Sequence, residues 1–212
     1  MSGNALPGAE LVVRTIAETA VENEKYFGDL DAVVGDGDFG YSLARGFEQI
    51  QADWDAIDKG TAFDLLKNVA QRVTSRIGGT SGPIWGTAFL RAAMVAKDKD
   101  ELTGADAVAM LRAAIEGIKA RGSAELGDKT LLDALIPVTD MLEERAKAGS
   151  TAGETLRAAA ATARSAAEAT RPMVAKKGRA AYTGERSVGT LDAGAVAVAV
   201  LIEALADQWQ RN

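Results

Sequence analysis

The sequence of 212 residues predicts a single all-α domain whose helices run up and down. Three observations lead to this prediction. Apolar residues recur with helical spacing in eight segments, Gly, Asp, Ser or Thr residues mark the boundaries between them, and most of the connections are short. Hydrophobic residues make up 47% of the chain, which is enough for a substantial core.

Eight segments carry the helical pattern. They are residues 7–26, 40–57, 62–77, 82–98, 104–121, 130–147, 151–173 and 191–210. The first begins with Pro7, which suits a first helical turn, and Leu11 and Ile16 recur on one of its faces. Pro83 is acceptable only in the first turn of the fourth segment.

The last two segments need separate arguments. Residues 151–170 are so rich in alanine that the periodicity fades, but alanine favours helix and permits close packing. Residues 195–202 alternate like a strand, yet the run is long, alanine-rich and continues to Ala206, so a largely buried helix is expected. Residues 174–190 form the one long connection, with three glycines and four basic side chains, and long loops in compact domains are usually functional.

Composition excludes several classes of function. The net charge of -6 opposes binding to nucleic acid or an anionic membrane through overall electrostatics. The chain has no histidine, which excludes Ser-His-Asp triads, phosphohistidine relays and ordinary zinc sites, and no cysteine, which excludes thiol chemistry. The first residues lack the features of a secretory leader and no stretch approaches a membrane span, so a cytoplasmic location is expected.

Three aspartates, Asp31, Asp36 and Asp38, lie within eight residues, and glycines at positions 35, 37 and 40 accompany them. Carboxylates this close repel one another, and a flexible backbone lets their oxygens converge. A hard divalent cation such as Mg²⁺ would relieve that repulsion. The alternative is a solvated turn in which the aspartates bond their own backbone and cap the next helix.

The motif Gly-Gly-Thr-Ser-Gly-Pro at residues 78–83 lies between two predicted helices. Free amide groups at the start of the second helix, with the hydroxyls of Thr80 and Ser81, would form a cradle for an anion. A helix N-cap at a tight crossing explains the same residues. A metal site and an anion cradle support each other, because nucleotide phosphates are usually bound as a Mg²⁺ complex. Arg179 and Arg186 would then neutralise phosphate oxygens, although an isolated arginine is more often a surface charge.

Three known motifs fit poorly. Residues 35–40 match G-x-G-x-x-G in form, but two aspartates in a pyrophosphate loop would repel the ligand. Residues 122–130 approach a Walker A loop, but Asp128 breaks the spacing. An EF-hand is excluded because Gly40 stands at a liganding position and Glu48 falls one residue late.

Four motifs follow one another along the chain. They are Gly-Asp-Gly-Asp-Phe-Gly (35–40), Gly-Gly-Thr-Ser-Gly-Pro-Ile-Trp-Gly-Thr (78–87), Arg-Gly-Ser-Ala-Glu-Leu-Gly-Asp-Lys-Thr (121–130) and Lys-Gly-Arg-Ala-Ala-Tyr-Thr-Gly-Glu-Arg-Ser-Val-Gly (177–189). In this order they resemble the nucleotide-binding L subunit of the dihydroxyacetone kinase family. The resemblance covers essentially the whole chain. It implies one nucleotide-binding L domain over residues 1–212, folded as an eight-helix antiparallel barrel with the nucleotide at one end.

The resemblance also implies a set of site residues. Asp31, Asp36 and Asp38 would ligate two Mg²⁺ ions that bridge the phosphates of ADP or ATP, and Thr80 and Ser81 would hold a phosphate. Further positions that match nucleotide contacts are Phe39, Gly40, Tyr41, Ser42, Gly122, Leu131, Arg179, Asp192, Ala193 and Gly194. Asp36, Asp38 and Arg179 are the residues expected in catalysis, through positioning and charge neutralisation.

Two positions depart from the family pattern. Phe39 stands where family members often have His or Cys, and Ala193 stands where they often have Pro. Phe39 cannot donate a side-chain hydrogen bond, so that phosphate contact must come from the backbone or be lost.

The resemblance implies a phosphoryl-transfer subunit that works with a partner. In the family, a histidine on a separate K subunit or domain holds the ketose covalently, and this chain has no histidine. In one branch of the family ATP binds, donates and leaves. In the other, ADP stays bound and is recharged by a phosphotransferase-system protein fed from phosphoenolpyruvate, and a free-standing L chain favours this branch. An ATP-dependent kinase of a four-carbon ketose, of the erythrulose type, is the alternative. A homodimer is left open, and neither nucleic acid nor a membrane is an expected partner.

Two other functional classes each account for part of the sequence. A regulatory module would use the nucleotide-loaded barrel to control a partner, but the intact aspartates and Arg179 count against a purely regulatory role. A helical carrier of lipid or another apolar ligand would suit an interior rich in Ala and Val. It would leave the aspartate cluster and the Gly-Arg loops unexplained.

Overall fold

The computed structural model describes residues 5–211, and the regular elements in this range are helical. The α-helices are α1 (Ala5–Glu22), α2 (Glu24–Ala32), α3 (Phe39–Ala52), α4 (Ala62–Arg76), α5 (Ser81–Ala96), α6 (Gly104–Gly122), α7 (Leu132–Ala148), α8 (Ala152–Glu168) and α9 (Ala193–Arg211). Two 3₁₀ segments, η1 (Trp54–Ala56) and η2 (Arg179–Ser187), complete the set.

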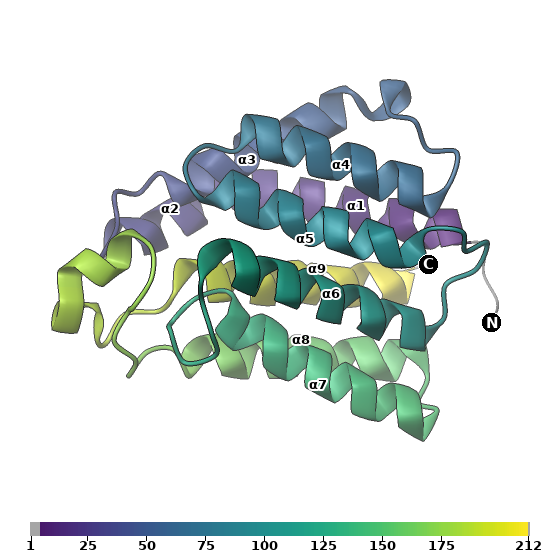
Figure 1. Cartoon of the computed structure of the whole chain (residues 1–212). Coiled ribbons are helices and arrows are strands. Elements are labelled where there is room, and N and C mark those ends of the chain that lie inside the picture. The colour runs from purple at the N-terminus through teal and green to yellow at the C-terminus, as the bar shows by residue number, and fades with distance from the viewer. Residues whose placement is uncertain (1–4, 212) are drawn as a thin grey trace.

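The long helices form a closed ring (Figure 1). From α3 to α9, each helix packs on its neighbours in the sequence, and α1 closes the ring by packing on both α3 and α9. The short helix α2 lies against α3 and α9 at one end of the molecule. The prediction of an all-α up-and-down barrel is therefore confirmed, and each of the eight predicted segments overlaps one of the long helices.

Local sequence signals fix several helix starts. The Thr103 side chain accepts the N–H of Asp106, and the Asp106 carboxylate accepts the N–H of Thr103, so these two residues form a capping box at the start of α6. Thr151 and Glu154 form the same arrangement at α8. Both helices therefore begin where hydroxyl and carboxylate side chains satisfy otherwise unpaired amide groups.

Small side chains allow close packing where the sequence was ambiguous. Residues 152–168 and 193–211 are both α-helices, as expected. Ala159, Ala163 and Ala167 on α8 are buried in one cluster with Ala195 and Ala199 on α9. A second cluster joins α1, α3, α4 and α5 around larger side chains, among them Phe47 and Phe89 with ring centroids 6.2 Å apart. Separate apolar clusters therefore hold the ring together, and alanines lie where α8 and α9 pack on each other.

Three predicted boundaries are wrong. The segment 7–26 divides at Asn23 into α1 and α2, the segment 40–57 ends as helix at 52, and the segment 151–173 ends at 168. The division at Asn23 matters most, because α2 carries the chain as far as Asp31 in helical form. Phe27 is the one buried residue of α2, so this helix has almost no apolar periodicity for a sequence pattern to detect.

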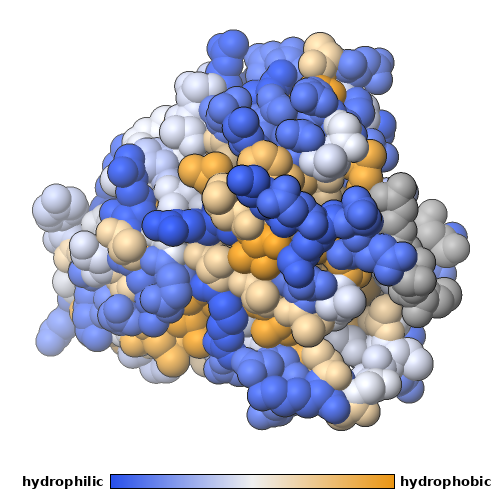
Figure 2. All heavy atoms as spheres, turned by 45° about the vertical axis from the view of Figure 1, so that its right-hand side comes forward, coloured by the Kyte–Doolittle hydropathy of each residue, from blue (hydrophilic) through white to orange (hydrophobic). Residues whose placement is uncertain are grey.

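The face of the molecule seen in Figure 2 is mainly polar. Figure 2 shows one face, on which apolar side chains appear in small groups between charged ones. No helix among residues 5–211 has both the length and the apolar character needed to cross a membrane. Scattered apolar side chains of this kind are ordinary for a folded domain.

Candidate functional site

Several loops and helix ends meet at the left-hand end of the ring in Figure 1. They are the loop after α2, the start of α5, the 3₁₀ segment η2 and the start of α9. Because consecutive helices run up and down, every second connection falls at this end. Motifs that lie far apart in the sequence are therefore brought to one place.

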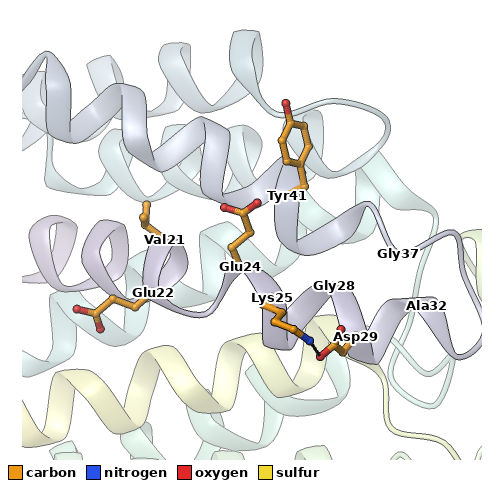
Figure 3. Close-up of a pocket in the computed structure, with 9 residues that line it drawn as sticks. All are labelled: Val21, Glu22, Glu24, Lys25, Gly28, Asp29, Ala32, Gly37 and Tyr41. Atoms are coloured by element: carbon orange, nitrogen blue, oxygen red, sulfur yellow. Dashed lines mark hydrogen bonds and ion pairs between the residues drawn. The ribbon is translucent and has the colours of Figure 1, made fainter.

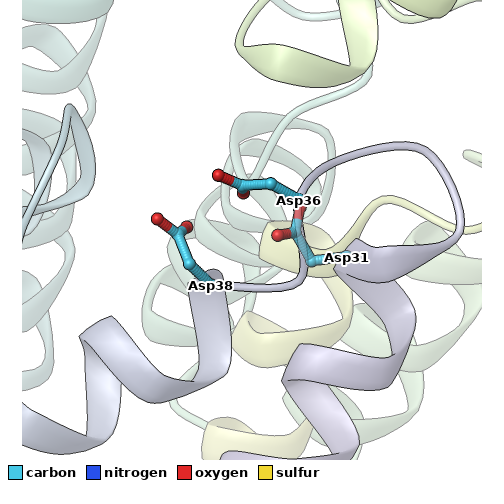
Figure 4. A group of neighbouring side chains, drawn as sticks. All are labelled: Asp31, Asp36 and Asp38. Atoms are coloured by element: carbon cyan, nitrogen blue, oxygen red, sulfur yellow. The ribbon is translucent and has the colours of Figure 1, made fainter.

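The three predicted metal-binding aspartates lie together (Figure 4). Asp31 is on the last turn of α2, Asp36 lies in the loop that follows, and Asp38 stands at the N-cap position of α3, where its side chain makes no capping hydrogen bond. One carboxylate oxygen from each lies within 4.8 Å of the others. Burial raises the pKa of Asp31, the N–H groups of Phe39 and Gly37 act in the opposite direction, and repulsion from the other two carboxylates adds to the rise. This is the arrangement expected of a site for a hard cation.

Glycine is required at two positions, one in this loop and one in the first turn of α3. A Cβ at Gly35 would collide with the Asp31 carboxylate, whose Cγ would be 2.8 Å away. A Cβ at Gly40 would collide with the carbonyl oxygen of Glu24 and lie 2.5 Å from the nitrogen of Gly28. The start of α3 therefore rests directly on the backbone of α2, which brings the aspartates within reach of one another.

Arg179 faces this cluster from η2. Its guanidinium pairs with Asp36 and lies 2.7 Å from the carboxylate of Asp38, and all three side chains are about half exposed. Desolvation acts to raise the pKa of Asp36, but the hydrogen bond and the charge of Arg179 outweigh it and lower that pKa. The guanidinium also approaches Gly79, 4.0 Å from where a Cβ would stand. The structure thus joins the aspartate loop, the loop before α5 and η2 at one point.

Two helix N-termini border the cluster. Thr80 precedes α5 and its side chain makes no capping hydrogen bond, so the amides of the first turn are free of a side-chain cap. The hydroxyl of Ser42, in the first turn of α3, lies 3.8 Å from the Cβ position of Gly78. The starts of α3 and α5 therefore lie beside the carboxylates, and the positive ends of their helix dipoles favour an anion there.

Phe39 uses its side chain for packing. Its ring lies 6.2 Å from the ring of buried Phe27 on α2. Its N–H donates a long hydrogen bond of 3.4 Å to the Asp31 carboxylate. The aromatic ring thus anchors α3 on α2, and only the backbone of this residue faces the site.

Another group of predicted residues lies at the start of α7 and α9. A Cβ at Gly194 would be 3.3 Å from the nitrogen of Leu131. Asp192 caps α9, because its carboxylate accepts the N–H of Ala195 at 2.7 Å, and its own N–H donates to the Thr170 hydroxyl at 3.0 Å. Desolvation raises the pKa of Asp192 to about 7, against the effect of the Ala195 N–H. Ala193 lies between these residues in the first turn of α9.

Gly122 is the last residue of α6, and a Cβ there would be 3.6 Å from Ile84 on α5. Both helix ends belong to the same end of the ring as the aspartates (Figure 1). Gly122 thus lies near α5, whereas Leu131 and Asp192 to Gly194 form a separate contact group.

A groove of about 570 Å³ lies beside the aspartate loop, between α1, α2 and α3 (Figure 3). Its lining residues are Val21, Glu22, Glu24, Lys25, Gly28, Asp29, Ala32, Gly37 and Tyr41. Three carboxylates and one amine line it, which does not suit a phosphate. The Tyr41 ring belongs to this groove and lies 5.1 Å from the Arg45 guanidinium, so residue 41 faces the candidate anion region only through its backbone.

Sequence reasoning missed two buried charged residues next to this end of the ring. Lys129 and Asp133 are 2% and 3% exposed. The Asp133 carboxylate accepts the N–H of Gly127 at 2.6 Å and of Thr130 at 2.7 Å, which fixes the turn before α7. Charged residues are expected at the surface, so no pattern marks such positions as internal.

Comparison with known proteins supports a family assignment. Residues 33–207 match the model of the DAK2 domain. The chain is 40% identical over 183 residues to the "PEP-dependent dihydroxyacetone kinase, ADP-binding subunit DhaL" of Escherichia coli, covering 86% of this chain and 87% of that protein. It is also 40% identical over 203 residues to the "L-erythrulose 1-kinase" of Mycolicibacterium smegmatis, but there it spans 94% of this chain and 35% of the longer protein.

Solved structures are similar over almost the whole chain. The dihydroxyacetone kinase of C. freundii in complex with AMP-PNP and Mg²⁺ superposes with a TM-score of 0.76 at 26% identity, covering 98% of this chain and 34% of that one. Its native form gives a TM-score of 0.75 at 28% identity, covering 97% of this chain and 35% of that one. The ring of helices is therefore a known architecture, found within longer chains as well.

Proposed function

The chain belongs to the DAK2 domain family, and we propose that it is the nucleotide-binding, phosphoryl-transferring subunit of a kinase for dihydroxyacetone or a related short ketose. The ketose would be held by a separate K subunit, because this chain has no histidine with which to hold it. As a phosphotransferase with an alcohol acceptor, the chain would be active only with that partner. The observation that carries this proposal is the cluster of Asp31, Asp36 and Asp38 with Arg179 beside two helix N-termini.

The donor set fits Mg²⁺. Three carboxylates with oxygens within 4.8 Å of one another are hard ligands in a site open to solvent on one side. Asp31, Asp36 and Asp38 would hold the metal, and we propose that they hold two ions. Bound Mg²⁺ would supply neutralisation of phosphate charge.

The remaining residues would hold the nucleotide of an ADP or ATP complex. The amides at the start of α5, with the hydroxyls of Thr80 and Ser81, would donate to phosphate oxygens, as would the first-turn amides of α3. We expect Arg179 to exchange Asp36 and Asp38 for phosphate oxygens when the nucleotide complex binds, because its half-exposed guanidinium can reorient. Its planar fork would then neutralise charge that develops on the transferred group.

The phosphate source is proposed from the relatives. A relative that the chain matches over 87% of its length carries "PEP-dependent" and "ADP-binding subunit" in its name. We therefore favour ADP that remains bound and is recharged by a phosphoenolpyruvate-dependent phosphotransferase system, whose phosphocarrier would be a second partner. The 40% identity to an L-erythrulose kinase supports an ATP-dependent four-carbon ketose kinase as the second candidate. In both cases we propose a cytoplasmic setting.

A thermal melt tests the nucleotide site. Protein stripped with chelator is melted alone, with Mg²⁺, with ADP, and with Mg²⁺ plus ADP or ATP. At a ligand concentration of 100 times Kd, folding is stabilised by about 2.7 kcal/mol, which raises Tm by roughly 5 to 10 °C for a chain of this size. We expect the rise only when metal and nucleotide are present together.

Substitutions in the aspartate cluster test whether the rise in Tm comes from binding at that site. Asp36→Asn and Asp38→Asn should remove the rise, whereas Asp55→Asn, at an exposed aspartate on η1, should keep it. A rise that persists in the first two variants would contradict the metal assignment. Turnover of dihydroxyacetone with an added K subunit, first with ATP and then with phosphoenolpyruvate and its carrier proteins, distinguishes the two phosphate sources. Nucleotide binding without turnover from either source would contradict the kinase function.

A further inference from the structure

A buried lysine, Lys129, lies between the two ends of the segment 174–190. Its ammonium donates to the backbone carbonyls of Met173 at 3.1 Å, Ser187 at 2.5 Å and Thr190 at 2.9 Å. The Thr190 hydroxyl is a fourth acceptor at 3.3 Å. Met173 immediately precedes the segment, whereas Ser187 and Thr190 belong to its last part. One ammonium group therefore joins both ends.

This arrangement is unfavourable on its own. The four acceptors are neutral, so none of them forms an ion pair with the buried ammonium. Desolvation lowers the pKa of Lys129, and the nearby charge of Asp192 acts in the opposite direction without outweighing it. The backbone of Lys129 is also left-handed, with φ of +61°. A lysine rarely adopts this conformation, which costs about 1–3 kcal/mol and is concentrated at functional positions. Because both the buried charge and the backbone conformation are unfavourable, we expect a lysine at residue 129 to have a functional role as well as a packing role.

The turn that carries Lys129 is fixed from the other side. Gly127 has φ of +90°, and Asp133 accepts the N–H groups of Gly127 and Thr130. This turn therefore holds the lysine side chain in place under the segment. The segment and the turn are also joined by the N–H of Lys176, which donates to the carbonyl of Asp128 at 3.1 Å.

The segment carries Arg179. The 3₁₀ segment η2 begins at Arg179 and ends at Ser187, whose carbonyl accepts the Lys129 ammonium. The Ser187 hydroxyl accepts the N–H of Ala175 at 2.9 Å, which closes the base of the same loop. The Arg179 side chain is half exposed, so its place opposite Asp38 depends on how the ends of its segment are held.

We propose that Lys129 is a positioning residue, an internal cation that closes the segment 174–190 and thereby sets where Arg179 meets the aspartate cluster. Its effect on phosphoryl transfer rests on the proposed function. Its effect on the segment does not, and can be measured in the free chain.

Hydrogen exchange of backbone amides tests the structural half of this proposal. Lys129→Met keeps the length of the side chain and removes the ammonium. Lys177→Met is the matched control, because Lys177 lies in the same segment but its side chain makes no hydrogen bond or ion pair to the turn before α7, unlike Lys176, which pairs with Asp128 at 3.3 Å. We expect amides in 174–190 to exchange at least about 10-fold faster in Lys129→Met while α4 and α5 are unchanged, and to change little in the control. Exchange like that of the wild type in Lys129→Met would overturn the proposal.

A double-mutant cycle tests the link to Arg179. With an added K subunit, Lys129→Met should lower kcat by roughly 10²-fold, the loss that a displacement of about 1 Å can cause. In the Arg179→Ala background, the same substitution should lower kcat less than about 3-fold further. Losses that multiply would show that Lys129 acts independently of Arg179 and would overturn the proposal.

Failure of the two proposals can be told apart. A wild-type chain that never turns over, together with faster exchange in Lys129→Met, would refute the proposed function and support the closing role of Lys129. Normal turnover by the wild-type chain, together with unchanged exchange in Lys129→Met, would support the proposed function and refute the closing role of Lys129. If Lys129→Met does not fold, Lys129→Arg keeps the charge but spreads its donors over a planar fork. It should leave the barrel helices protected and still raise exchange in 174–190, and uniform exchange across the chain would count against a local role.

Discussion

Asp192 makes the stability of this fold depend on pH in the direction opposite to that of an ion-paired carboxylate. Its carboxylate caps α9 while partly withdrawn from water near Asp133, and desolvation raises its pKa from 3.8 to about 7. Between these values the folded chain keeps a proton that the unfolded chain releases. The folded state therefore binds more protons, and the free energy of unfolding falls as pH rises from about 4 to about 7.

The size of this effect follows from the pKa difference. About three pH units at 1.36 kcal/mol each give an upper limit of about 4 kcal/mol. Asp192 retains some accessible surface, so solvent screening lowers the value. We expect about 2 kcal/mol.

Asp192→Asn isolates this contribution, because the amide oxygen can still accept the N–H of Ala195 but cannot ionise. Urea unfolding of both proteins is measured from pH 4.5 to 7.5, and other titrating groups cancel in the difference. The variant should gain about 2 kcal/mol relative to the wild type across this range. The control Asp55→Asn, at an exposed site, should give a flat difference. A flat or falling difference for Asp192→Asn would refute the reasoning, since it would mean that Asp192 is already ionised at pH 4.5.

Four further substitutions test the packing of the ring, and urea unfolding measures each. Gly40→Ala should destabilise the fold by about 1–3 kcal/mol because its Cβ meets the backbone of α2, whereas Gly8→Ala, with no atom within 4 Å, should stabilise it by about 0.5 kcal/mol. Equal effects would show that the contact with α2 is unimportant. Phe47→Ala removes a ring with no exposed area and should cost about 3–5 kcal/mol, and a loss below 1 kcal/mol would contradict its place in the core. Arg164→Met breaks a two-bond pair with Glu203 that links α8 to α9, and since both side chains are partly exposed the loss should stay below about 1 kcal/mol and shrink in high salt. A larger, salt-independent loss would mean that the pair is effectively buried.

The long helices were predictable because their signals are local. Apolar spacing, threonine caps and glycine punctuation act within a few residues, and all eight predicted segments overlap a helix. The short helix α2 was not predictable, because Phe27 is its one buried side chain and it follows α1 with a break only at Asn23. Its stability comes from packing on α3 and α9, which the sequence pattern does not contain.

The candidate site also has a part that local sequence predicts and a part that it does not. Asp31, Asp36 and Asp38 are close in sequence, so their convergence was predictable from charge and glycine spacing. The meeting of Arg179 with this cluster is a long-range contact, and only the resemblance to a family suggested that the two motifs share a site. The role of Lys129 depends on a left-handed backbone and on carbonyls from a distant segment, neither of which residue types reveal.

The direction of the first and last helices determines how this chain can be joined to other molecules. Helix α1 begins, and α9 ends, at the right-hand end of the ring in Figure 1, and the N–H of Ala5 is bonded to the carbonyl of Asp100 in the loop there. The aspartate cluster lies at the other end. An affinity tag, a surface anchor or a fused domain attached at either terminus would therefore leave the cluster facing solution, and immobilised chains would present it to added partners in one orientation.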